Sequence, residues 1–152
     1  MPYGTPTGQA FGSQIGYVAR PGFVGELIEL QVLSIFAVPL VNGGFVEFIT
    51  MPLPEGDWDV SASVSFNADP TTNLTRVVGY ITQVPGTLDD ESRYVQDSFA
   101  AAGVVPVGDI VRHISPSQVS LLATANVYLG GFATFSVAGL VVFGTLRARR
   151  MS

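Results

Sequence analysis

The chain has 152 residues, the size of one domain or of one domain with an extended arm. Hydrophobic residues make up 47% of it and charged residues only 12%, whereas ordinary soluble domains carry roughly 25% charged residues. A lone monomer so poor in charge would expose apolar patches, so we expect an oligomer. The net charge of −5 argues against nucleic acid as a partner, and the lack of Cys excludes disulfides and thiol chemistry.

Residues 1–23 predict an extended N-terminal arm, and residues 24–152 predict one β-sandwich domain. Gly, Pro, Ser, Thr and Gln dominate the arm, a composition that buries too little apolar surface to fold alone. A disordered tail and an arm that orders on a neighbouring subunit are the two interpretations. Widely spaced apolar side chains favour the second, and we expect these five to anchor the arm: Tyr3, Phe11, Ile15, Tyr17 and Phe23.

The first half of the domain predicts four strands. Three are expected over residues 25–32, 35–41 and 45–51, with Pro39 favouring an edge or a bulge in the second. Asn42-Gly43-Gly44 predicts a hairpin-type turn, because Asn and Gly accept positive φ. The clearest strand follows the turn at 54–57, since its apolar and polar residues alternate strictly. The apolar set is Trp58, Val60, Ala62, Val64 and Phe66.

The second half predicts a strand over 74–82, a long acidic loop over 83–97, an Ala-rich helical turn over 98–103 and a strand over 104–114. Two more strands are expected over 120–134 and 140–149, with a turn near 136–139. Residues 114–146 carry no charge, which would also suit a membrane span. Interrupting Pro, Asn and Gly residues and many β-type residues favour buried strands and no membrane contact.

About eight short strands separated by Gly and Pro turns predict an all-β fold, an antiparallel jelly roll or β-sandwich. Nothing in the pattern predicts an enzyme. Asp57 and Asp59 share a strand face and could bind Ca²⁺, but a solvated face is the favoured interpretation. His113 is the only His and no Gly-x-Ser-x-Gly motif is present, so we predict no catalytic residues, no metal site and no cofactor. Arg147 and Arg149 share a strand face, which suits salt bridges at a subunit interface better than nucleic acid.

Three segments, in this order, resemble small virion proteins of tailed bacteriophages. They are residues 53–62 (LPEGDWDVSA), 127–135 (VYLGGFATF) and 144–151 (GTLRARRM). The pattern is an aromatic-bearing strand after a Gly-Asp-Trp turn, then a Val-Tyr-Leu strand, then a closing Ala-Arg-Arg. The likeness covers residues 25–151 and leaves the arm outside.

The resemblance implies a jelly-roll domain that assembles as a homotrimer on the outer capsid surface as a decoration (cement) protein. Its partners would be itself and the major capsid protein, with the arm reaching across the capsid. We expect a trimer interface formed by Tyr128, Phe132, Phe143, Arg147 and Arg149. The alternative is a head- or tail-fibre module whose loops 67–73 and 83–97 bind a receptor. The N-terminus lacks the features of a signal peptide, so we expect synthesis in the host cytoplasm.

Overall fold

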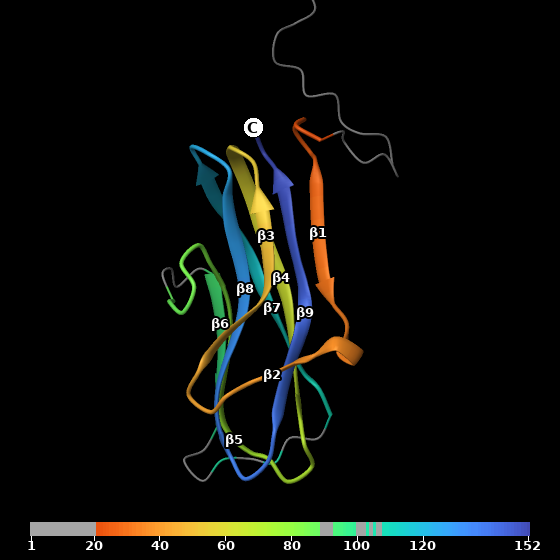
Figure 1. The fold of residues 1–152 in the computed structure, drawn as a ribbon, viewed down its shortest axis with the longest axis vertical. Helices are drawn as coiled ribbons and strands as arrows, with labels where there is room; N and C mark the ends of the chain where they lie inside the picture. Colours follow the sequence, from red (N-terminus) through yellow and green to blue (C-terminus); the bar gives the residue numbers. More distant parts are fainter. Residues whose placement is uncertain (1–20, 89–92, 100–102, 104, 106–107) are drawn as a thin grey trace, which may run out of the picture.

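A computed structural model describes residues 21–88, 93–99, 103, 105 and 108–152 of the chain. These residues form nine β-strands and one short 3-10 helix, η1 (Figure 1). The elements are β1 (Leu27–Val32), η1 (Ser34–Phe36), β2 (Val38–Pro39), β3 (Phe45–Leu53), β4 (Gly56–Ala68), β5 (Asn73–Thr82), β6 (Tyr94–Ser98), β7 (Ile110–Leu121), β8 (Ala125–Ser136) and β9 (Leu140–Arg150).

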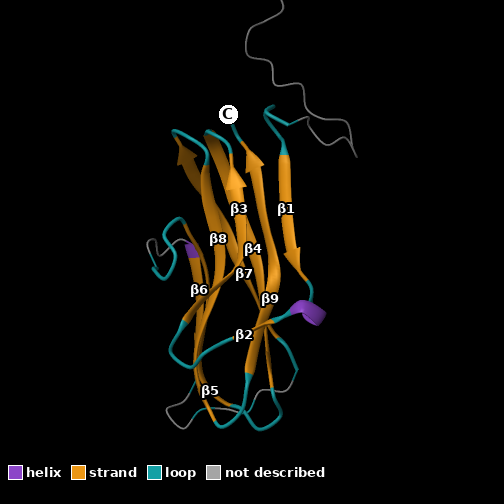
Figure 2. Ribbon diagram, in the orientation of Figure 1, coloured by secondary structure: helices purple, strands orange, loops and turns teal. Residues whose placement is uncertain are grey.

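The strands form two antiparallel sheets that pack face to face as a sandwich. Sheet A has the order β1-β9-β4-β7, with β2 added beside one end of β9, and sheet B has the order β3-β8-β5-β6. Apart from the two-residue β2, eight strands are divided between the two sheets in this order, which is the arrangement of a jelly roll. Figure 2 shows most of them running along the long axis of the molecule. The predicted all-β sandwich is confirmed, with nine strands in place of about eight.

The alternation in β4 explains why it lies at the centre of sheet A. Trp58, Val60 and Val64 are fully buried between the sheets, and Ser61 and Ser63 point outward. Strand β9 lies on one side of β4 and β7 on the other. The uncharged C-terminal third is extended chain, as predicted. The described residues contain no helix long and apolar enough to cross a membrane.

The turn at Asn42-Gly43-Gly44 is confirmed, but the hairpin predicted around it is wrong. Gly43 has φ 72°, and the Asn42 side chain accepts a hydrogen bond from the Phe135 amide. However, β2 pairs with β9 in sheet A, whereas β3 pairs with β8 in sheet B. The turn therefore carries the chain from one sheet to the other. Residues 35–41, predicted as one strand, form the end of η1 and the two-residue β2.

Two other predicted boundaries are wrong for a common reason. The strand expected to end at Ile114 continues as β7 through Pro116 to Leu121, and residues 122–124 form a turn before β8. β7 is an edge strand of sheet A, and its register with β4 shifts between Val60 and Ala62. An edge strand with a bulge tolerates a proline that a central strand would not.

The predicted loop over 83–97 contains most of β6, and residues 100–102 of the predicted helical turn lie outside the described residues.

Candidate functional site

The structure describes one of the five predicted arm anchors. Tyr3, Phe11, Ile15 and Tyr17 lie outside the described residues. Phe23 lies just before β1 and is 63% exposed. The role of these residues therefore stays a prediction.

The five predicted trimer-interface residues lie on opposite faces of the sandwich. Tyr128 and Phe132 alternate with buried residues of β8 and lie on the outer face of sheet B. Phe143, Arg147 and Arg149 alternate with buried residues of β9 and lie on the outer face of sheet A. Because the sandwich separates the two groups, they cannot form one continuous patch on one copy. A single contact that uses both groups would have to be heterologous, joining different faces of two copies.

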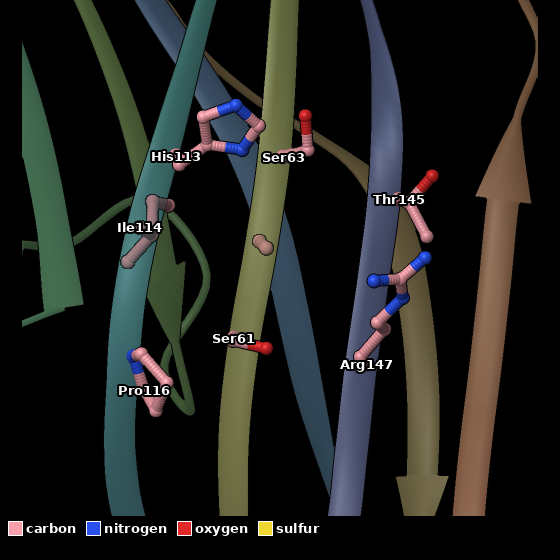
Figure 3. A pocket seen from close by; sticks show the side chains of 8 residues that line it. Ser61, Ser63, His113, Ile114, Pro116, Thr145 and Arg147 are labelled. Atoms are coloured by element: carbon pink, nitrogen blue, oxygen red, sulfur yellow. The ribbon is translucent and has the colours of Figure 1, made fainter.

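An open pocket of about 450 Å³ lies on the outer face of sheet A (Figure 3). Ser63 of β4 lies opposite both His113 of β7 and Thr145 of β9, and Ser61 lies opposite Arg147. The small hydroxyl side chains form the floor of the pocket because larger residues stand only at its margins. Its lining residues are Ser61, Ala62, Ser63, His113, Ile114, Pro116, Thr145 and Arg147.

The pocket places a histidine near two serines but lacks the third member of a hydrolytic triad. In such a triad a carboxylate orients the histidine, and no carboxylate lines this pocket. His113 is exposed on an edge strand rather than enclosed. The arrangement offers hydrogen-bonding groups to a polar partner and does not assemble a nucleophile with an oriented base.

Two of the three C-terminal arginines pair within the chain. Arg147 Nε lies 2.5 Å from Glu29 Oε2 on β1, with both side chains largely exposed. Arg150 Nε lies 3.3 Å from Glu26 Oε2, and both of these side chains are about nine-tenths buried. The Arg150 guanidinium stacks 4.7 Å from the Trp58 ring and also donates to the Glu55 carbonyl. Arg150 therefore belongs to the folded core, whereas Arg149 is exposed on the outer face of sheet A.

On the outer face of sheet B, a cluster of side chains surrounds the buried Tyr80. The Tyr80 ring is 1% exposed and meets Phe45 edge-on with ring centroids 5.6 Å apart. Its hydroxyl donates to Glu47 Oε1 over 2.8 Å, and the same oxygen accepts the Gly86 amide at 2.6 Å. Gly130 lies beneath the ring, where a Cβ would overlap it. Glu47 thus fastens the chain after β5 to the face of sheet B.

We expect Tyr80→Phe to lower the free energy of unfolding by about 1 kcal/mol, the value of one hydrogen bond. Burial first, and then the hydrogen bond to Glu47 and its charge, raises the pKa of Tyr80 above its ordinary value. A pKa raised on folding stabilises the protein below the unfolded pKa of about 10 and loses that contribution as the pH rises further. Urea denaturation at about pH 8 and about pH 11 should show a smaller alkaline loss for Tyr80→Phe than for the wild type. Tyr128→Phe is the control, and an equal loss in Tyr80→Phe and the wild type would contradict this expectation.

Half of the exposed large apolar side chains among the described residues belong to one stretch of chain, which runs from just before β1 to just after β2. Eight of the sixteen large apolar residues that are exposed lie between Phe23 and Val41. Ile35 of η1 is the most exposed of this group, at 78%, and Phe36 and Val41 follow at 68% each. We call this group the apolar edge. It consists of Phe23, Val24, Leu27, Leu30, Leu33, Ile35, Phe36 and Val41.

Sequence patterns gave little warning of these features. Apolar residues are usually read as buried, so Ile35 and Phe36 were predicted to be part of a strand. The Glu26–Arg150 pair joins residues 124 positions apart, which no local pattern reports. The Glu47–Tyr80 bond likewise joins residues far apart in sequence, on β3 and β5, across β8. The one usable signal was Gly130-Gly131 within an apolar strand, since glycine there indicates close approach of another group.

The acidic residues of the described ranges do not gather into a metal centre. No group of three or more His, Cys, Asp or Glu side chains is placed to hold an ion in those ranges. Asp57 accepts hydrogen bonds from the hydroxyls of Ser120 and Ser152, each with an oxygen–oxygen distance of 2.6 Å. These bonds lower the pKa of Asp57. Asp57 thus ties the C-terminus to β4 and β7.

Comparison with known proteins shows a distant structural similarity and no related sequence. No family model and no curated protein matches the chain. A solved structure of infectious bursal disease virus, Gx strain, matches with a TM-score of 0.47 and 12% sequence identity. The match covers 81% of this chain and 31% of that chain.

Proposed function

We propose that this protein is a structural virion protein, namely a homotrimeric decoration protein that binds the outer surface of an assembled phage capsid. The observation that carries the proposal is the apolar edge, which lies on a chain with only 12% charged residues. Exposed apolar residues that gather in one region of a soluble domain mark a surface for a partner. The resemblance of three segments to virion proteins of tailed phages gives that partner its identity, the major capsid protein.

In this proposal η1 forms part of the contact with the shell. Ile35 and Phe36 belong to η1, which lies beside β9, and both side chains are exposed. A protein that binds only the assembled shell stabilises the shell by mass action. Three linked copies bind together, so their avidity exceeds the affinity of one copy without any new contact.

The test uses parent particles that lack the protein and the purified full-length chain. Wild type should occupy such particles in hundreds of copies and raise the temperature at which the heads rupture. Ile35→Ser with Phe36→Ser should weaken binding at least about tenfold, because each apolar side chain contributes about 1.5–3 kcal/mol when buried. Leu122→Ser is the control, since Leu122 is 98% exposed and lies far from the apolar edge in sequence, in the turn between β7 and β8.

Normal occupancy by the Ile35→Ser, Phe36→Ser variant would show that η1 does not contact the shell. Failure of the wild type to bind any head would contradict the decoration role itself. Electron micrographs of particles with and without the protein separate these results, because they report both occupancy and position.

The receptor-binding alternative places its contacts in loops 67–73 and 83–97, on either side of β5 in the sequence. Residues 67–73 end β4 and lead into β5, and residues 83–88 follow the other end of that ten-residue strand. Ten extended residues span about 33 Å, so a site that joined residues 67–73 to residues 83–88 of one copy would have to be about that long. Only β6 returns toward the first loop, with Asp97 paired to Val77. A copy number of a few tens or fewer on the tail would nevertheless favour a fibre module over a decoration protein.

A further inference from the structure

A β-bulge in β7 brings His113 to the outer face of sheet A. At this point β4 advances two residues while its partner β7 passes three, from Ser117 to Ile114. The extra residue reverses the alternation of β7, so Val119 on one side of the bulge and Ile114 on the other are both buried. Without the extra residue, His113 would point into the core.

The pocket of sheet A lies at this bulge (Figure 3). His113 lies opposite Ser63 of β4, and Ser63 lies opposite Thr145 of β9. Pro116, within the bulge, stands at the same margin of the pocket as His113. Bulges occur most often at sheet edges and beside active sites, where they redirect a side chain. Here the redirected side chain is a histidine that faces a row of hydroxyls.

Arg147 supplies a positive charge at the opposite margin of the pocket. Its Nε contacts Glu29 of β1, and β1 lies on the other side of β9 from β4. The terminal nitrogens of the guanidinium make no hydrogen bond within the part of the chain that the structure describes. Figure 3 shows this end of the side chain directed toward Thr145. None of the described lining residues carries a carboxylate, so an anionic ligand would meet a guanidinium that Glu29 holds in place.

The other lining groups indicate what kind of molecule would carry the negative charge. Ser61, Ser63 and Thr145 have hydroxyls that both donate and accept hydrogen bonds, which suits the hydroxyls of a sugar. None of the described lining residues is Phe, Tyr or Trp, so a nucleobase would have no such ring to stack on. The volume of about 450 Å³ lies within the range of sites for small organic molecules, roughly 300–1,000 Å³.

We propose that this pocket binds a saccharide unit that carries a carboxylate. The carboxylate accepts hydrogen bonds from the terminal nitrogens of Arg147, and the sugar hydroxyls bond to the three hydroxyl side chains of the pocket. His113 completes the site at the β7 margin, where a ring nitrogen bonds to a further sugar hydroxyl. The site lies on strands and not on loops 67–73 and 83–97. The proposal does not depend on the decoration role.

The first experiment titrates the full-length protein with sodium glucuronate and, separately, with glucose at matched pH and ionic strength. The two sugars differ in the carboxylate alone. His113 is the only histidine, so its ring resonances report directly on the pocket. Glucuronate should shift these resonances saturably and bind at least about tenfold more tightly than glucose, because hydrogen bonds to a charged group are the stronger ones.

Three results of this titration would overturn the proposal. Unchanged His113 resonances would show that glucuronate does not enter the pocket. Equal affinities for glucose and glucuronate would show that the carboxylate is not recognised. Sodium acetate is the third probe, and acetate that binds as tightly as glucuronate would show that the pocket takes a bare carboxylate and no sugar.

The second experiment repeats the glucuronate titration on variants. Arg147→Gln should weaken binding at least about tenfold. Arg149→Gln is the matched control, since Arg149 is exposed on the same face two residues away and does not line the pocket. Equal losses in the two variants would mean that the charge of the whole face attracts the anion, and would overturn the proposal.

A third variant tests the floor of the pocket. Ser63→Val removes one hydroxyl and keeps a residue type that favours strands, and it should weaken glucuronate binding by about two- to tenfold. Wild-type affinity in this variant would contradict the proposed contact with the sugar. Urea denaturation followed by Trp58 emission checks that all three variants are folded. Arg147→Gln should be folded, because exposed ion pairs such as the one with Glu29 add little stability.

Discussion

Arg150→Ala should lower the free energy of unfolding by about 3–5 kcal/mol, because it leaves the buried carboxylate of Glu26 without its positively charged partner. The substitution also removes the guanidinium that stacks on Trp58 at 4.7 Å. Urea denaturation followed by Trp58 emission measures the loss. Arg149→Ala is the matched control, since Arg149 is the exposed neighbour on the same strand and should cost no more than about 0.5 kcal/mol.

A second variant separates the ion pair from the stacking. Removing both charges in Glu26→Gln with Arg150→Ala should cost less than the sum of the two single changes, because the stranded charge is gone. A loss below about 1 kcal/mol for Arg150→Ala would place the pair among ordinary surface ion pairs and contradict its assignment to the core.

The C-terminal arginines show where sequence patterns reach their limit. Their spacing correctly predicted that Arg147 and Arg149 share a face of an extended strand. It could not report that Glu29 and Glu26, more than a hundred residues earlier, supply partners for Arg147 and Arg150. Local alternation fixes which way a side chain points. The pairing of distant strands decides what it meets.

The fold divides in the same way between local and distant causes. The alternation of β4 and the turn at Asn42-Gly43-Gly44 are local, and both were predictable. The order β1-β9-β4-β7 is set by contacts between distant strands, so it could not be read from any window of sequence. Pro116 misled the prediction because its meaning depends on whether β7 lies at an edge. The low content of charged residues predicted that some apolar surface would be exposed. It did not indicate which residues would form that surface, so the apolar edge was not predicted.

The segments that carry the resemblance to phage virion proteins are explained by the fold. Trp58 fills the core at the start of β4, and its indole donates to the Pro54 carbonyl over 3.0 Å. Gly130 makes room for the Tyr80 ring. Arg150, near the end of the third segment, pairs with Glu26. Because each of these residues has a structural task, the resemblance supports the jelly roll most directly. The surface residues of the apolar edge are needed to argue the partner.

Gly144, which opens the third of those segments, should be the glycine least tolerant of substitution. It lies in β9 between Val32 of β1 and Val64 of β4. A Cβ there would overlap the Ser63 carbonyl oxygen and lie 3.1 Å from the Val64 Cα. Because these obstacles are backbone atoms at the centre of sheet A, no rotamer change relieves them. We expect Gly144→Ala to cost at least about 3 kcal/mol, the upper end for overpacked sites.

Gly131→Ala tests whether the backbone obstacle is the cause. A Cβ at Gly131 would lie 3.0 Å from Val142 Cγ2 and 3.3 Å from Phe66 Cε1, both side-chain atoms that can move. It should therefore cost less than Gly144→Ala, about 1–3 kcal/mol. Urea denaturation of the two variants decides the matter. Equal losses would mean that β4 and β9 can separate slightly without losing their pairing, and sheet A would then be less rigid at its centre than its register implies.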